Sequence, residues 1–139
     1  LTDALENMKQ KGMRFVPGTV DEWMDCGNKA VTVETNSRML QFLHDEGKDL
    51  VSSSAVVTNA TIIPPCFIGD HVVIENSTVG PNVSVGAHTK ITDSNVKNSL
   101  IQTQSTISNA NLDDAMIGNH AKFDGNFTKI SIGDYSVLE

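Results

Sequence analysis

The chain has 139 residues, of which 39% are hydrophobic and only 5% aromatic, and its 10 basic and 17 acidic residues give a net charge of −7. This length fits one ordinary domain, or a domain with an added piece. A negative chain without a basic stripe argues against nucleic acid and anionic membrane as partners, because both require clustered positive charge.

The cysteines and the hydropathy pattern bear on the compartment. Cys26 and Cys66 lie far apart and have no CxxC spacing, so neither a zinc site nor a disulfide framework is expected. No apolar run approaches the roughly 20 residues of a membrane span, and no basic-then-apolar signal segment is seen. A cytoplasmic protein is therefore expected.

The first elements in chain order are helical and extended. Asp3 and Glu6 have the spacing of a capping box, and Gly12 is placed to end the helix as a left-handed residue. An extended segment is expected over residues 13–16, before the Pro-Gly pair that follows it. This pattern predicts a short helix and one strand.

A second helix is expected after a turn. Asn28 is a suitable N-cap, and apolar residues continue at helical spacing to about Asp45, before Gly47. Residues 1–50 are too short to hold a sheet of their own. Their order indicates the closing elements of a larger α/β domain whose earlier strands are missing.

From residue 51 to the end, aliphatic residues recur every five or six positions in three interleaved columns. Steps of fifteen to seventeen residues within a column correspond to about three short strands and their corners. The pattern predicts a three-sided parallel β-coil, but it does not give the hand of that coil. The columns are Val51, Ile68, Val85, Ile101, Ile117, Ile132; Val57, Ile74, Ile91, Ile107, Phe123; and Ile62, Val79, Val96, Leu112, Phe127.

Corner residues follow the first column. A glycine comes directly after most of its members, where the backbone must bend or lie close to the next coil. Four positions after a column member comes a small residue that is expected to point inward, as at Val72, Thr89 and Ser105. Asn and Asp suit the corners because they tolerate left-handed φ; they stand at positions 59, 70, 76, 82, 93, 95, 98, 109, 111, 113, 114, 119 and 126.

Three histidines fall in one corner position. His71 and His88 are one coil apart, and His120 lies two coils further on. A catalytic role is one alternative, because hexapeptide acyltransferases use a histidine base. We expect turn residues instead, because histidine also tolerates left-handed φ. His44, near the end of the second helix, is expected to face its C-terminal dipole.

The chain resembles the sugar-1-phosphate nucleotidyltransferases that carry a C-terminal left-handed β-helix. The resemblance rests on Leu1-Thr2-Asp3-Ala4-Leu5, on the turn Glu22-Trp23-Met24-Asp25-Cys26-Gly27, on the helix through Glu34-Thr35-Asn36, and on hexapeptides such as Ile68-Gly69-Asp70, Val79-Gly80-Pro81 and Ile132-Gly133-Asp134. The turn followed by a helix is fairly specific, whereas hexapeptides alone are shared with acyltransferases. The resemblance implies residues 1–50 as the end of the transferase domain and residues 51–139 as a left-handed β-helix.

The resemblance also implies an activity. Such enzymes join a nucleoside triphosphate to a sugar 1-phosphate and release pyrophosphate, using Mg²⁺ to neutralise charge on the phosphate oxygens. Their phosphate-binding loop has no match in this sequence, so we expect a C-terminal fragment that is inactive alone. Asp25 matches a carboxylate that holds the Mg²⁺; from spacing alone, it would be read as a turn or capping residue. Trp23 is expected to pack in a core.

Three function classes remain open from the sequence. The first is this nucleotidyltransferase fragment, with the β-helix serving structure, oligomerisation or regulation. The second is a hexapeptide-repeat acyltransferase, which is disfavoured because no long inserted loop interrupts the coil. The third is a non-catalytic assembly module that forms a homo-oligomer through the flat sides of the β-helix. The leading helices are expected to cover one end of the coil.

Overall fold

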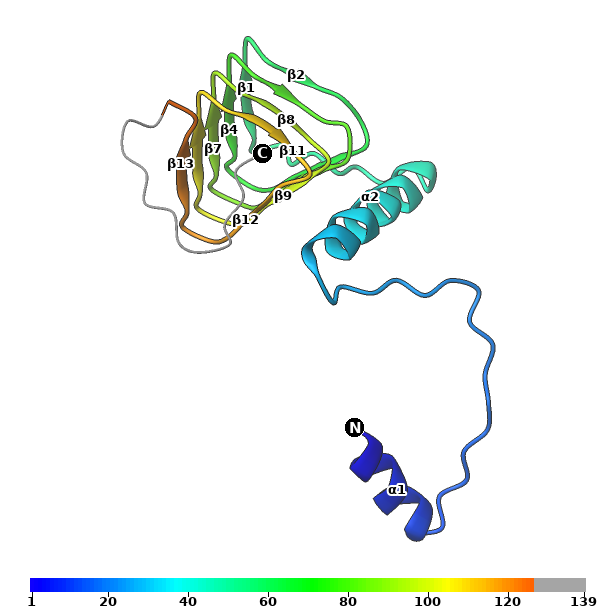
Figure 1. Cartoon of the computed structure of the whole chain (residues 1–139). Helices are drawn as coiled ribbons and strands as arrows, with labels where there is room; N and C mark the ends of the chain where they lie inside the picture. The colour runs from blue at the N-terminus through cyan, green and yellow to red at the C-terminus, as the bar shows by residue number, and fades with distance from the viewer. Residues whose placement is uncertain (127–139) are drawn as a thin grey trace.

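In the computed structural model, which describes residues 1–126, a parallel β-solenoid of about four turns follows two helices (Figure 1). The solenoid strands are only two or three residues long. Two members of the predicted aliphatic columns, Ile132 and Phe127, lie outside the described residues. The elements are α1 (Thr2–Gln10), α2 (Lys29–Asp45), β1 (Val56–Thr58), β2 (Thr61–Ile62), β3 (Cys66–Ile68), β4 (Val73–Glu75), β5 (Thr78–Val79), β6 (Val83–Val85), β7 (Lys90–Thr92), β8 (Asn95–Lys97), β9 (Ser99–Ile101), β10 (Thr106–Ser108), β11 (Asn111–Asp113), β12 (Met116–Ile117) and β13 (Lys122–Asp124).

Three parallel sheets form the sides of the solenoid. Face A contains β3, β6, β9 and β12; face B contains β1, β4, β7, β10 and β13; face C contains β2, β5, β8 and β11. Every pairing between neighbouring strands is parallel, as stacked coils require. The three-sided coil predicted from the aliphatic columns is therefore confirmed over the described residues.

The predicted columns are the ladders of the interior. On face A, Ile68 pairs with Val85, Val85 with Ile101, and Ile101 with Ile117. The columns of faces B and C pair in the same way. Side chains in the middle coils are fully buried, because each aliphatic residue packs between its equivalents in the coils above and below. These ladders form the hydrophobic core.

The corner after face A is as the sequence predicts. His71, His88, Gln104 and His120 have φ of +55°, +59°, +57° and +55°. At Gly86 an added Cβ would lie 2.6 Å from the backbone nitrogen of Thr103 in the next coil, so the close approach of two coils requires glycine there. The residues expected to point inward are buried; they are Val72, Thr89 and Ser105.

Many of the Asn and Asp residues also occupy left-handed corners. Positive φ is found at Asn59, Asn76, Asn82, Asp93, Asn98, Asn109 and Asp114. Their amides bond from coil to coil, as when Asn82 Nδ2 donates to Asn98 Oδ1 at 2.9 Å. The prediction was wrong for Asn95, Asn111 and Asp113, which lie in β8 and β11. Asn95 Nδ2 donates to Asn111 Oδ1 at 3.0 Å, so the same ladder bonding is satisfied on a strand.

Buried serines occupy further inward positions. Ser94 Oγ donates to the carbonyl of Thr92 at 2.7 Å and accepts from the N–H of Ala110 at 3.0 Å. Among the described residues, no buried side-chain nitrogen or oxygen lacks a hydrogen-bond partner. The serine hydroxyls therefore pair with backbone groups at corners where ladder bonds are interrupted.

Helix α2 lies along face A (Figure 1). Asn28 is its N-cap, as predicted, and its side chain accepts from the N–H of Val31 at 3.1 Å. Val33 and Leu40 are the buried residues of the helix. The expectation that leading helices cover an end of the coil was wrong for α2, because the side of the solenoid offers apolar strand residues. The first coil is therefore left partly open, and Val57 there remains 42% exposed.

The residues before α2 extend away from the solenoid (Figure 1). Helix α1 has no buried residue. Gly12 ends it with φ of +79°, as predicted. The capping box was wrong: the N-cap position is Leu1, with no side-chain bond, so Asp3 lies inside the first turn. Residues 13–16 are assigned to no strand.

Candidate functional site

Asp25 lies in the turn that leads into α2. Its Oδ1 accepts a hydrogen bond of 2.7 Å from the N–H of Cys26, and its carbonyl oxygen accepts one of 2.7 Å from Thr35 Oγ1. A Cβ at Gly27 would lie 3.3 Å from Asp25 Oδ2, so glycine leaves room beside this oxygen. Asp25 therefore closes the turn, while Asn28 caps the helix.

A hollow of about 260 Å³ opens beside this turn. Arg38 forms an ion pair with Glu22 across it. Met24 is half-buried, whereas the neighbouring residues of the turn are exposed. The hollow thus brings together carboxylates and one guanidinium from the extended segment and from α2. It is lined by Glu22, Trp23, Met24, Asp25, Val31, Glu34, Thr35 and Arg38.

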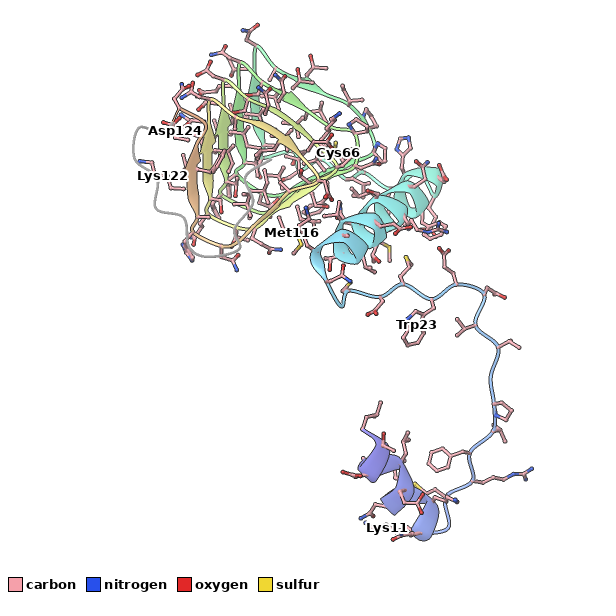
Figure 2. The ribbon with its side chains drawn as sticks, viewed as in Figure 1. Lys11, Trp23, Cys66, Met116, Lys122 and Asp124 are labelled. Carbon is pink, nitrogen blue, oxygen red and sulfur yellow. The ribbon has the colours of Figure 1, made fainter. Side chains whose placement is uncertain are left out.

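Trp23 does not pack in a core within the described residues, contrary to expectation. Its side chain is 81% exposed, and Figure 2 shows the ring directed away from the solenoid. A large aromatic side chain usually loses such exposure on folding, because its burial is strongly favourable. The exposure of Trp23 marks a surface that the described residues leave uncovered.

The fit of this turn to Mg²⁺ is partial. Mg²⁺ requires about six oxygen ligands in near-octahedral geometry. Asp25 offers one hard oxygen, since among the described residues no donor bonds its Oδ2. Those same residues contain no group of three or more His, Cys, Asp or Glu side chains able to hold a metal ion. Asp25 suits the role of one ligand among several, but the described residues do not form a site by themselves.

The corner histidines act as turn residues. The rings of His71 and His88 stack with centroids 5.1 Å apart. Their backbone N–H groups donate to Ser54 Oγ and to the carbonyl of Asp70, which holds both residues in the left-handed conformation. His120, with positive φ, occupies the same position. His44 lies in the last turn of α2, where the prediction placed it.

A second hollow, of about 240 Å³, lies on face C and was not found from the sequence. Lys97 and Asp113 form an ion pair of 3.0 Å at its edge. The signal was present, because polar residues recur with the coil period at outward positions of this face. The lining residues are Thr78, Gly80, Asn95, Val96, Lys97, Asn111, Leu112 and Asp113.

The carboxyl groups with shifted pKa values accept hydrogen bonds between neighbouring coils of the solenoid. The pKa of the Asp113 carboxyl is lowered, first by the amide of Asn98 and then by Lys97. Asp124 has a lowered pKa because Asn109 and a backbone N–H bond its carboxylate. Burial raises the pKa of the Cys66 thiol. Cys26 is exposed, and both thiols are free.

Neither helix in the described part combines the length and the apolar character needed to cross a bilayer. No known protein-family model and no curated protein matches the sequence.

Proposed function

We propose that this chain is the C-terminal part of a sugar-1-phosphate nucleotidyltransferase whose solenoid is a left-handed β-helix of hexapeptide repeats. The observation that carries the proposal is Asp25, a carboxylate held at the end of an extended segment directly before a helix, with one oxygen bonded to no described residue. The resemblance of the surrounding turn to this family assigns the chemistry. Residues 1–50 belong to the transferase domain, and residues 51–139 form the β-helix.

Uncovered apolar side chains before the solenoid support a larger α/β domain. Phe15, Val16 and Trp23 are 50%, 71% and 81% exposed, and α2 exposes Met39 and Phe42. A helix that is apolar on two sides is suited to burial between two bodies. We assign the covering body to the rest of the transferase domain, with the extended segment joining its sheet through backbone bonds.

The proposed reaction joins a nucleoside triphosphate to a sugar 1-phosphate. A phosphate oxygen of the sugar phosphate attacks the α-phosphorus, the bond to the β-phosphate breaks, and pyrophosphate leaves. Bound Mg²⁺ would neutralise the charge that gathers on these oxygens. In this chain, Asp25 would supply one oxygen ligand, and Gly27 would keep the space beside that oxygen open. The remaining ligands and the phosphate-binding loop would come from the preceding domain.

The test uses the protein with its proposed upstream domain. We expect pyrophosphate release from one nucleoside triphosphate with one sugar 1-phosphate, dependent on Mg²⁺ and lost in Asp25→Asn. Glu46→Gln, at the far end of α2, is the matched control and should keep full activity. Residues 1–139 alone should release none. The proposal fails if no pair from a full panel of triphosphates and sugar 1-phosphates yields pyrophosphate.

A second candidate is a non-catalytic assembly module in a cytoplasmic homo-oligomer. The observation that favours it is that α2 lies on face A, whereas among the described residues no helix lies on face B or face C. Flat sheet faces can pack against a second copy. Light scattering that finds one chain per particle at high concentration would remove this candidate. Binding of acetyl-coenzyme A to this chain, measured by calorimetry, would support the acyltransferase alternative instead.

A further inference from the structure

Helix α2 makes specific polar contacts on two sides. Residues on one side, spaced four, three and four apart, meet the solenoid; they are Lys29, Val33, Asn36 and Leu40. Residues on the other side line the hollow beside Asp25; they are Val31, Glu34, Thr35 and Arg38. Both spacings follow the helical repeat, so each set forms a continuous stripe. One rigid element therefore touches both the solenoid and the candidate site.

The solenoid stripe fixes α2 at two separated points. Lys29 Nζ lies 2.7 Å from a carboxylate oxygen of Asp114 and 2.6 Å from the carbonyl of the same residue. Ser84 Oγ donates to Asn36 Oδ1 at 2.6 Å, and Asn36 Nδ2 donates to the carbonyl of Asn82 at 3.4 Å. Because the two points lie two turns apart along the helix, they set both the position and the tilt of α2 on face A.

The opposite stripe fixes the turn. Thr35 Oγ1 donates to the carbonyl of Asp25, and Arg38 forms an ion pair with Glu22. Thr35 sits next to Asn36 in the sequence, so the residue that bonds the turn and the residue that bonds the solenoid move together. Within the described residues, the segment 1–24 makes no hydrogen bond or ion pair with the solenoid, so the turn is attached to the solenoid through α2.

We propose that the solenoid positions the Asp25 carboxylate through α2, with Lys29 and Asn36 as anchors and Thr35 as the positioning residue. The functional meaning of this arrangement rests on the proposed function, whereas the mechanical coupling does not. A carboxylate on an exposed turn would otherwise sample many orientations, and ordering it costs conformational entropy. The solenoid supplies the fixed surface against which that orientation is set.

Trp23 makes the coupling measurable in the chain itself. It is the single tryptophan, two residues from Asp25, and it is exposed on the same turn. Time-resolved fluorescence anisotropy reports how freely this turn moves. We expect a lower residual anisotropy in Thr35→Val, recovery in Thr35→Ser, and a lower value in the double variant Ser84→Ala, Asp114→Ala.

The matched control is Glu75→Gln, which removes the 2.9 Å ion pair with Lys90 on face B and should leave the anisotropy unchanged. Circular dichroism checks that each variant keeps its solenoid. An unchanged anisotropy in the Ser84, Asp114 double variant overturns the coupling. A loss in Thr35→Val that Thr35→Ser does not restore overturns the role of the hydroxyl.

The second readout uses the protein with its upstream domain. Substitution of a residue that orients a metal ligand typically weakens metal affinity by roughly tenfold or more. The Mg²⁺ concentration for half-maximal pyrophosphate release should therefore rise about tenfold in Thr35→Val and return to its original value in Thr35→Ser. An active enzyme with unchanged Mg²⁺ dependence in Thr35→Val overturns the inference. Absent activity with altered Trp23 anisotropy overturns the proposed function and leaves the coupling standing.

Discussion

The ammonium group of Lys29, at the first residue of α2, lies 2.7 Å from the carboxylate of Asp114, which directly follows β11. Both side chains are 54% exposed. An exposed ion pair of this kind contributes about 0–1 kcal/mol to folding. We therefore regard it as a contact that places α2 rather than one that stabilises the fold.

This interpretation predicts a small effect of Asp114→Asn on stability. The free energy of unfolding, measured by urea titration, should fall by less than about 1 kcal/mol, and by less still in high salt, because exposed charges are screened. Asp93→Asn, at an exposed corner on another edge, is the control. A loss of several kcal/mol would mean that the pair holds the fold together.

The interior ladders predict a strong dependence on position along the solenoid. Ile91 is fully buried between Ile74 and Ile107, so Ile91→Ala should lower the free energy of unfolding by about 2–5 kcal/mol. Val57→Ala, in the same ladder at the exposed first coil, should cost about 1 kcal/mol or less. Equal losses at both positions would contradict this ladder structure.

The buried serines are expected to matter through their hydroxyls. Ser94→Ala leaves the N–H of Ala110 without its partner, at a cost of about 1–3 kcal/mol, whereas the carbonyl of Thr92 still accepts from the N–H of Asn109. Ser53→Ala, on an exposed residue near the first coil, should change stability little. Chemical denaturation of the two variants compares them directly. Equal stabilities would show that these bonds contribute nothing.

Cys66 predicts a loss of stability in alkali. Its thiol has a raised pKa because burial disfavours the thiolate, and this outweighs the bond from the Val83 backbone. A raised pKa in the folded state gives stability that is fully present below the ordinary value of about 8.5 and is lost as pH rises toward the folded value. The melting temperature should therefore fall above about pH 8.5, and Cys66→Ala should flatten that fall.

A thiol reagent provides the accompanying control. Cys26 is exposed and Cys66 buried, so the native protein should react at Cys26 and release Cys66 only on unfolding. Rapid labelling of both thiols in the native state would contradict the burial of Cys66. Mass spectrometry of the labelled peptides distinguishes the two positions.

The lowered pKa of Asp113 predicts a loss of stability at acidic pH. Its pKa is lowered by the hydrogen bond from the Asn98 amide and by the hydrogen bond and charge of Lys97. A lowered folded pKa gives stability that is present above the ordinary value of about 3.9 and is lost as pH falls through the folded value. Carbon NMR titration should find the Asp113 pKa raised in Asn98→Ala and also in Lys97→Met, relative to the unsubstituted chain. An unchanged pKa in both variants would contradict these two causes.

The solenoid was predictable because its signal is local and repeated. Each ladder position requires only an aliphatic residue at a fixed step, and the register of Ile68, Val85 and Ile101 follows from counting. The α2 N-cap at Asn28 was equally local. The position of α2 on face A could not be predicted, because it depends on a contact between Lys29 and Asp114, which are 85 positions apart in the sequence. Nothing in either segment specifies the other.

The misplaced residues have physical causes of the same kind. Asn95 and Asn111 were assigned to corners by propensity, but an amide ladder is satisfied equally well on a strand. Trp23 was expected to be in a core because of its size, but no described residue covers its ring, which is 81% exposed. At Asp25, the sequence predicted a turn residue but not its bond to Thr35.

The rise of the solenoid and the pitch of α2 are nearly commensurate. Successive coils are separated by about 4.8 Å, and one turn of an α-helix advances about 5.4 Å. A helix laid along such a surface meets a similar landscape after sliding by a single coil, so apolar packing alone distinguishes these alignments poorly. The Lys29 contact with Asp114 and the Asn36 bonds to Ser84 and Asn82 together select one alignment, and the loss of both would leave several neighbouring alignments close in energy.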